Sequence, residues 1–213
     1  IAFGLAWGII AAVLLFHAQI VAWTGEISAS HPLFILAVYA PAIAAVLLVT
    51  VYAGGGGLGR FLSRLRLWRA PVAWYGLLLL GIPLVFVAGA AVKGNLGGAP
   101  FPFASLPEML AAMLFMLVLG PVEEFGWRGL ALPILQRWMA PLWAGTLLGA
   151  IWGVWHLPAF FLGGTPQSAW GFTPFLVGSI SVSVILTLLF NVSRGSILLA
   201  MLFHFQLNNP LWP

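Results

Sequence analysis

Charged residues are nearly missing from this chain of 213 residues, of which 6% are Asp, Glu, Lys or Arg and 62% are hydrophobic. Soluble domains carry roughly 25% charged residues, so the composition excludes an ordinary soluble protein. A net charge of +4 could attract nucleic acid, but eight cations spread over so apolar a chain cannot follow a phosphate backbone. We therefore expect an integral membrane protein with no nucleic-acid partner.

Cysteine and aspartate are absent altogether. Without cysteine, this chain has no disulfide bond, no thiolate metal ligand and no cysteine nucleophile. Without aspartate, it cannot form an aspartyl dyad. A Gly-x-Ser-Gly motif is also missing, and Ser179, Ser181 and Ser183 have no base near them in the sequence, which argues against a serine protease.

Long apolar runs make up most of the chain. A membrane-spanning helix needs about 20 mostly apolar residues. Seven such runs lie near residues 1–23, 33–53, 71–91, 108–137, 142–162, 173–191 and 196–212. The predicted fold class is an all-α membrane protein, with about seven transmembrane helices in one bundle and a single polytopic domain over residues 1–213.

Two segments depart from a simple span. The fourth run, 108–137, is too long for one span and contains Pro121 and Pro133. Because proline removes a backbone donor and bends a helix, we expect this run to be kinked. In Leu58–Arg69, apolar residues recur at helical spacing with arginines on the other faces. This pattern predicts a basic amphipathic helix at the lipid interface, serving as a topological anchor or in the capture of substrate or lipid.

The loop cations indicate the orientation of the chain in the membrane. Three loops on one side contain six arginines, which are Arg60, Arg64, Arg66, Arg69, Arg137 and Arg194. The opposite loops contain one cation, Lys93, together with Glu26 and Glu108. Cytoplasmic loops are enriched in Lys and Arg, so we expect the arginine side to face the cytoplasm.

Ionisable residues within apolar runs are candidates for function, because a charge at the centre of a membrane costs at least about 2.5–3.5 kcal/mol. Such residues and their polar companions are Glu123, Glu124 and Arg128 in the fourth run, Trp152 and His156 in the fifth, and His204 and Asn208 in the seventh. At about 1.5 Å of rise per residue, Glu124, His156 and Asn208 lie about 20–22 Å from the arginine side. His204 is less than one turn shallower. This agreement in depth predicts one shared site.

The chemistry open to this set is the activation of water by acid–base catalysis. One glutamate could act as the base on a water molecule held by His156. His204 and Asn208 are suitable donors to the oxyanion of an acyl-transfer reaction. Two alternatives remain, a purely structural ion pair and a proton relay in a transporter or channel, although no internal repeat supports a transporter.

In order along the chain, the motifs read Glu123-Glu124-x-x-x-Arg128, Trp152-x-x-x-His156 and His204-x-x-x-Asn208. They resemble the motifs of the CAAX protease and bacteriocin-processing family of intramembrane glutamate endopeptidases. The resemblance is carried by residues 123–208, inside a motif-bearing core of roughly 108–212. Trp152 stands where the family more often has phenylalanine, and Trp127 stands where phenylalanine is common; both keep an aromatic residue.

The resemblance implies an intramembrane endopeptidase whose site residues have separate roles. The implied roles are activation of water by Glu123 and His156, stabilisation of the oxyanion by His204 and Asn208, and support of the site by Glu124, Arg128 and Trp152. The implied substrate is a membrane-associated peptide or a membrane-anchored protein, prenylated or not. We expect the protein in a prokaryotic cell membrane, with the active site open toward the cytoplasmic side.

No cofactor is expected. Nothing in the chain resembles His-Glu-x-x-His, the helical zinc motif of metalloproteases. A zinc ion held by one or two glutamates and two histidines is the less favoured alternative. A non-catalytic member of the family, acting as an immunity factor or scaffold, is a further alternative.

Overall fold

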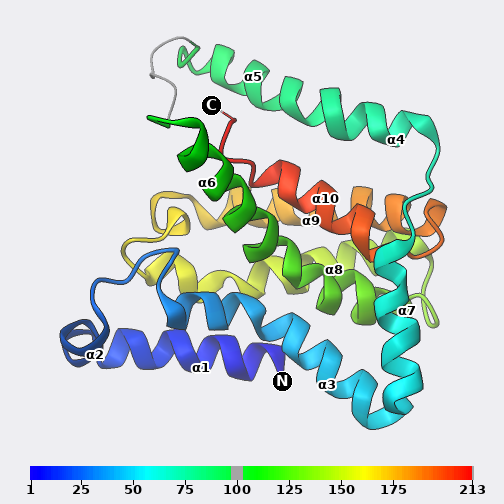
Figure 1. Ribbon diagram of the computed structural model, residues 1–213, viewed down its shortest axis with the longest axis horizontal. Coiled ribbons are helices and arrows are strands. Elements are labelled where there is room, and N and C mark those ends of the chain that lie inside the picture. Colours follow the sequence, from blue (N-terminus) through cyan, green and yellow to red (C-terminus); the bar gives the residue numbers. More distant parts are fainter. Residues whose placement is uncertain (97–102, 213) are drawn as a thin grey trace.

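The computed structural model describes residues 1–96 and 103–212, which form helices and connecting loops with no strand among them. Figure 1 shows most of the long helices running lengthwise through one bundle. The α-helices of the described residues are α1 (Ala2–Leu15), α2 (His17–Thr24), α3 (Pro32–Ser63), α4 (Val72–Gly76), α5 (Ile82–Val92), α6 (Leu106–Leu119), α7 (Leu132–Leu135), α8 (Pro141–Trp155), α9 (Phe172–Val192) and α10 (Ile197–Leu207). The predicted all-α class is confirmed.

The expected number of seven spans is not confirmed. Among the described residues, five helices are long and apolar enough to cross a membrane, or up to six if α1 and α2 form one bent span. The first run does not form a straight span because α2 turns away from α1 by 95°. The last run is shortened because α10 ends at Leu207, just before Asn208, Asn209 and Pro210.

The fourth run forms one helical span, Leu106–Leu135, of 30 residues. Its irregularity is a series of changes in helical pitch. The α-helix α6 gives way to a 3₁₀ turn at Pro121–Glu123 and then to a π-helical segment at Phe125–Ala131, before α7 completes the span. The kink expected from the two prolines is not confirmed; the irregularity lies in these tight and wide turns, and π-helical turns are frequent at functional sites.

The backbone of α3 breaks at Gly54, where φ is 62° and ψ is −173°. Helix resumes after this glycine and continues through the 3₁₀ turn Arg64–Arg66. Figure 1 shows this second part of α3 running across the ends of the bundle helices. Phe61 is buried while Arg60 is exposed, as an amphipathic helix at the interface requires.

Glycines allow α8 to approach α9 closely. A Cβ atom on Gly149 would lie 2.6 Å from the Ile180 Cα atom and 2.8 Å from the Ser183 Cβ atom. Gly145 and Gly153 contact α9 in the same way, through Thr187 and Leu176 respectively. Small residues at such spacing allow membrane helices to pack backbone to backbone, which holds the helix that carries Trp152 in place.

Gly149→Ala should therefore destabilise the bundle by about 1–3 kcal/mol, because the added methyl group meets backbone that cannot move aside. The measurement is the apparent midpoint of thermal unfolding of the purified protein in detergent. Gly89→Ala in α5 is the matched control, since nothing lies within 4 Å of its added Cβ atom. Equal midpoints for the two variants would contradict this account of the α8–α9 contact.

Candidate active site

Both glutamates lie where the fourth span changes pitch. Glu123 ends the 3₁₀ turn that starts at Pro121, and Glu124 precedes the π-helical segment. The side chains are almost fully enclosed, with Glu123 3% exposed and Glu124 and Arg128 both 0% exposed. Carboxylates and a guanidinium in such surroundings need partners close by.

Glu124 has two partners on the same oxygen. Its Oε1 atom accepts hydrogen bonds from Arg128 Nη1 at 3.0 Å and from His204 Nδ1 at 2.7 Å. Whenever Glu124 is ionised it only accepts, and the hydrogen of the second contact is then on His204 Nδ1. These bonds join the fourth span to α10 and fix the orientation of the His204 ring.

Glu123 accepts two indole hydrogen bonds. Trp127 Nε1 donates to Oε2 at 3.2 Å, and Trp152 Nε1 donates to the same atom at 2.8 Å. Within the described part of the chain, no donor is recorded for the other oxygen, Oε1. The Glu123 carboxylate is thus held in one orientation with one oxygen left for a reacting molecule.

His156 is positioned by the end of α8. Its backbone N–H donates to Gly153 O at 3.2 Å, so the last turn tightens and Trp152 O is freed. His156 Nδ1 donates to that carbonyl at 2.9 Å, which leaves Nε2 unprotonated in the neutral ring. The carboxylate of Glu123 is close enough to interact electrostatically with the imidazole.

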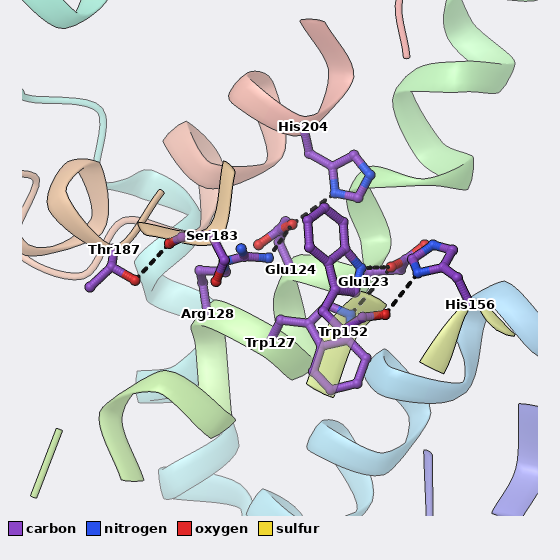
Figure 2. A network of polar contacts seen from close by, with 9 residues as sticks. All are labelled: Glu123, Glu124, Trp127, Arg128, Trp152, His156, Ser183, Thr187 and His204. Carbon is purple, nitrogen blue, oxygen red and sulfur yellow. Dashed lines mark hydrogen bonds and ion pairs between the residues drawn. The ribbon is translucent and has the colours of Figure 1, made fainter. Parts of the chain in front are cut away.

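Trp152 contacts Glu123, Arg128 and both histidines (Figure 2), as the following distances show. The Arg128 guanidinium lies 4.9 Å from the centre of its ring, a cation–π distance. The rings of His156 and His204 meet it edge to face, at centroid distances of 5.6 and 5.4 Å. One tryptophan thereby separates and orients both histidines while its N–H holds Glu123.

His204 and Asn208 meet next to the backbone of Gly120. A Cβ atom on Gly120 would lie 2.6 Å from Asn208 Nδ2 and 3.2 Å from His204 Nε2. Only glycine leaves both nitrogen atoms in place here. The motifs did not reveal Gly120, because its role depends on the pairing of α6 with α10 and not on its neighbours in sequence.

One cavity of about 330 Å³ is bordered by Glu123, His156, His204 and Asn208, the four residues predicted to be catalytic. Trp152 also lines it, whereas Glu124 and Arg128 lie behind the wall. Much of the remaining wall is apolar or aromatic and includes Phe34, Met116, Trp155, Trp170 and Phe175. No motif in the sequence marked these five, since apolar and aromatic residues are common throughout the chain.

The cavity extends away from the arginine loops. Its lining includes Ala29, Pro166, Gln167 and Trp170, which belong to the loops before α3 and before α9. Figure 1 shows these loops at the end of the bundle opposite the loops that precede α4, α8 and α10. The prediction that the site opens toward the arginine-bearing, cytoplasmic side therefore has no support from the cavity.

A zinc ion bound at this site was the less favoured alternative from the sequence. No group of three or more His, Cys, Asp and Glu side chains among residues 1–96 and 103–212 is arranged to hold a metal ion. The donor atoms of Glu124 and His204 already face each other, and Glu123 Oε2 is shared by two indoles. The residues present fit a hydrogen-bonded site better than a zinc site.

Comparisons with known proteins match the part of the chain that contains this site. A family model described as "Type II CAAX prenyl endopeptidase Rce1-like" matches residues 105–209. The curated protein "CAAX prenyl protease 2" from Methanococcus maripaludis is 29% identical over 137 residues, covering 62% of this chain and 50% of that protein. The chain thus spans about half the length of the curated relative that it matches.

The apolar helices and the family match define the class as an integral membrane protein. Over residues 105–209, the chain is similar to the CAAX protease and bacteriocin-processing family. This confirms the resemblance drawn from the three motifs, all of which lie within the matched residues. The catalytic roles of the individual residues stay predictions.

Arg128→Met should destabilise the protein by about 3–5 kcal/mol, because it leaves the Glu124 carboxylate buried without its cation. The double variant Glu124→Gln/Arg128→Met should recover part of this loss, since it buries no charge. Thermal unfolding in detergent measures both. A double variant that is no more stable than the single one would show that the ion pair is not the cause.

Proposed function

We propose that this protein is an intramembrane endopeptidase that hydrolyses a peptide bond with water activated by Glu123. The observation that carries the proposal is the meeting of Glu123, His156, His204 and Asn208 on one cavity. These residues come from three separate helical segments, which a structural ion pair would not require. The family match and the name of the curated relative support the same class of reaction.

In this mechanism, the attacking water lies between Glu123 Oε1 and His156 Nε2. Glu123 accepts one proton while the water oxygen forms a bond to the carbonyl carbon. His156 Nε2 accepts a hydrogen bond from the same water, because its other nitrogen donates to Trp152 O. When the tetrahedral intermediate collapses, Glu123 returns the proton to the leaving amine, which gives a carboxyl group and an amine.

Asn208 Nδ2 and His204 Nε2 are the proposed donors to the oxyanion. His204 can donate from Nε2 only if the Glu124–His204 pair holds one proton more than a carboxylate and a neutral imidazole do together. That extra proton gives either an imidazolium beside a carboxylate or an imidazole beside a carboxylic acid. Glu124 therefore acts through His204, as a positioning and proton-holding group.

The proposed substrate is a membrane-associated peptide or protein with apolar residues near the cleaved bond. Apolar and aromatic walls suit such side chains and exclude bulk water from the reaction. Prenylated proteins are one such class, by analogy with the name of the relative. We propose that catalysis needs no metal ion and takes place in a prokaryotic cell membrane.

Glu123→Gln and His156→Ala should each lower kcat for a quenched fluorescent peptide by roughly 10²–10⁴-fold, the range for loss of a general base or its partner. Glutamine keeps an oxygen for the two indoles, so the fold should persist. The unfolding midpoint of each variant serves as the control. Turnover equal to that of the unmodified protein in both variants would overturn the assignment.

Gly120→Ala should lower kcat by about 10²-fold, as expected when reacting groups are displaced by about 1 Å. The added methyl group would occupy space within 2.6 Å of Asn208 Nδ2. Gly8→Ala in α1, where nothing lies within 4 Å of the added Cβ, is the matched control. If Gly120→Ala cleaves peptide as well as Gly8→Ala does, Asn208 and His204 are not the oxyanion donors.

A further inference from the structure

We infer that a pocket on the arginine side of the protein binds the phosphate group of an anionic phospholipid. The pocket has a volume of about 510 Å³, and none of the residues that border it also borders the catalytic cavity. One wall is formed by residues 66–71, which lead to α4, and the other by residues 192–194 at the end of α9. The inference is independent of the proposed peptidase activity.

The pocket is strongly cationic. Three of its bordering residues are arginines, Arg66, Arg69 and Arg194, and none is acidic. All three side chains are exposed, and none of their guanidinium groups forms a hydrogen bond or an ion pair with residues 1–96 or 103–212. The four glutamates of the chain lie elsewhere, two of them enclosed at the candidate active site and two in the α2–α3 loop and the first turn of α6. The pocket therefore attracts an anion from outside the chain, with no carboxylate of its own to compete.

The pocket lies at the depth of the lipid headgroups. Three candidate membrane spans have an end at it, since Pro32–Arg66 and Phe172–Val192 end there and Val72–Val92 begins beside it. Trp68 borders the pocket and is 60% exposed. Tryptophan is enriched at the boundary between membrane and water, so its position agrees with this depth. An anion available at this level is the phosphate group of a phospholipid.

Hydrogen bonds connect the two walls without using the side chains of the three arginines. Arg64 Nε donates to Gly195 O at 2.8 Å, which ties the turn before the first wall to the loop after the second. Ser196 Oγ donates to Leu67 O, and Ser196 is fully buried. Because the walls are joined before any ligand binds, less conformational freedom is lost when the arginines bind an anion.

The backbone at Arg194 points to a role for its side chain. Its φ is 58°, and among the described residues no other non-glycine residue has a positive φ. Glycine or asparagine is the ordinary residue in this conformation. The end of α9 does not need the guanidinium, since Ser193 N donates to Leu189 O at 3.0 Å and Gly195 N donates to Phe190 O at 2.8 Å. A strained arginine that borders a pocket is accounted for by a ligand in that pocket.

Arginine suits a phosphate group because its planar guanidinium donates two parallel hydrogen bonds to phosphate oxygens. Three guanidinium groups also discriminate between phospholipids. A choline headgroup carries its own cation, which the arginines repel, whereas a glycerol headgroup leaves the phosphate charge uncompensated. The pocket should therefore prefer an anionic phospholipid to a zwitterionic one.

Titration calorimetry with short-chain phosphatidylglycerol, on the purified protein in a neutral detergent, tests the site. Arg66→Gln/Arg194→Gln removes one cation from each wall, and Arg60→Gln/Arg137→Gln removes two exposed arginines that do not border the pocket. The first variant should bind this lipid at least about tenfold more weakly, as expected for the loss of hydrogen bonds to a charged group. The second should bind it as the unmodified protein does. Arg69→Gln, which leaves the end of α9 untouched, should also weaken binding.

Two further ligands distinguish the sources of the phosphate group. Short-chain phosphatidylcholine should bind the unmodified protein more weakly than phosphatidylglycerol, and inorganic phosphate alone should bind more weakly still. Inorganic phosphate that binds as tightly as the lipid would overturn the assignment to a phospholipid. Equal losses in the two double variants would show attraction by overall charge, and a failure of the unmodified protein to bind phosphatidylglycerol would remove the site. Peptide cleavage enters none of these measurements, so their outcome does not depend on the proposed function.

Discussion

The structure depends on how one buried carboxylate, that of Glu124, is bound through its Oε1 atom, since its Oε2 atom has no hydrogen-bond partner among the described residues. In a chain so poor in charge, an ion that is 0% exposed cannot be hydrated, so its partners must come from the fold. Arg128 on the same span and His204 on α10 supply them at 3.0 and 2.7 Å. Because Trp152 lies over the Arg128 guanidinium, the same ion pair also places the indole that holds Glu123.

Irregular backbone supplies the other contacts around the site. Pro133 has no N–H to donate to Gly129 O, and Arg64 from the interfacial part of α3 donates to that carbonyl at 2.7 Å. The tightened end of α8 likewise frees Trp152 O for His156. Breaks in regular hydrogen bonding are costly in a membrane, and here the freed groups bind side chains that connect the site to its surroundings.

The sequence predicted the helical class, the two-sided distribution of arginines and the convergence of Glu123, His156, His204 and Asn208, because each depends on composition or on helical spacing. It could not predict the bend between α1 and α2 or the short α10, since tertiary packing sets where these apolar runs end. The sequence also could not predict that Gly120 and Phe175 belong to the site, because their contacts are made between helices distant in the sequence. The side of the membrane toward which the cavity opens stays a prediction, because depth along a helix does not reveal which end of a bundle is closed by packing.

The surroundings of the two glutamates differ, and Glu123 is the better candidate for the catalytic base of the proposed mechanism. Glu124 Oε1 is bound to a cation and to a histidine, and the residue lies outside the lining of the cavity. Glu123 borders the cavity, and its two donors are neutral indoles that share one oxygen. Both donors bind Oε2, and Oε1 of Glu123 has no recorded donor among the described residues. Under the proposed mechanism, this difference explains why an enclosed apolar site contains two adjacent carboxyl groups: Glu124 orients His204, and Glu123 faces the cavity where water would react.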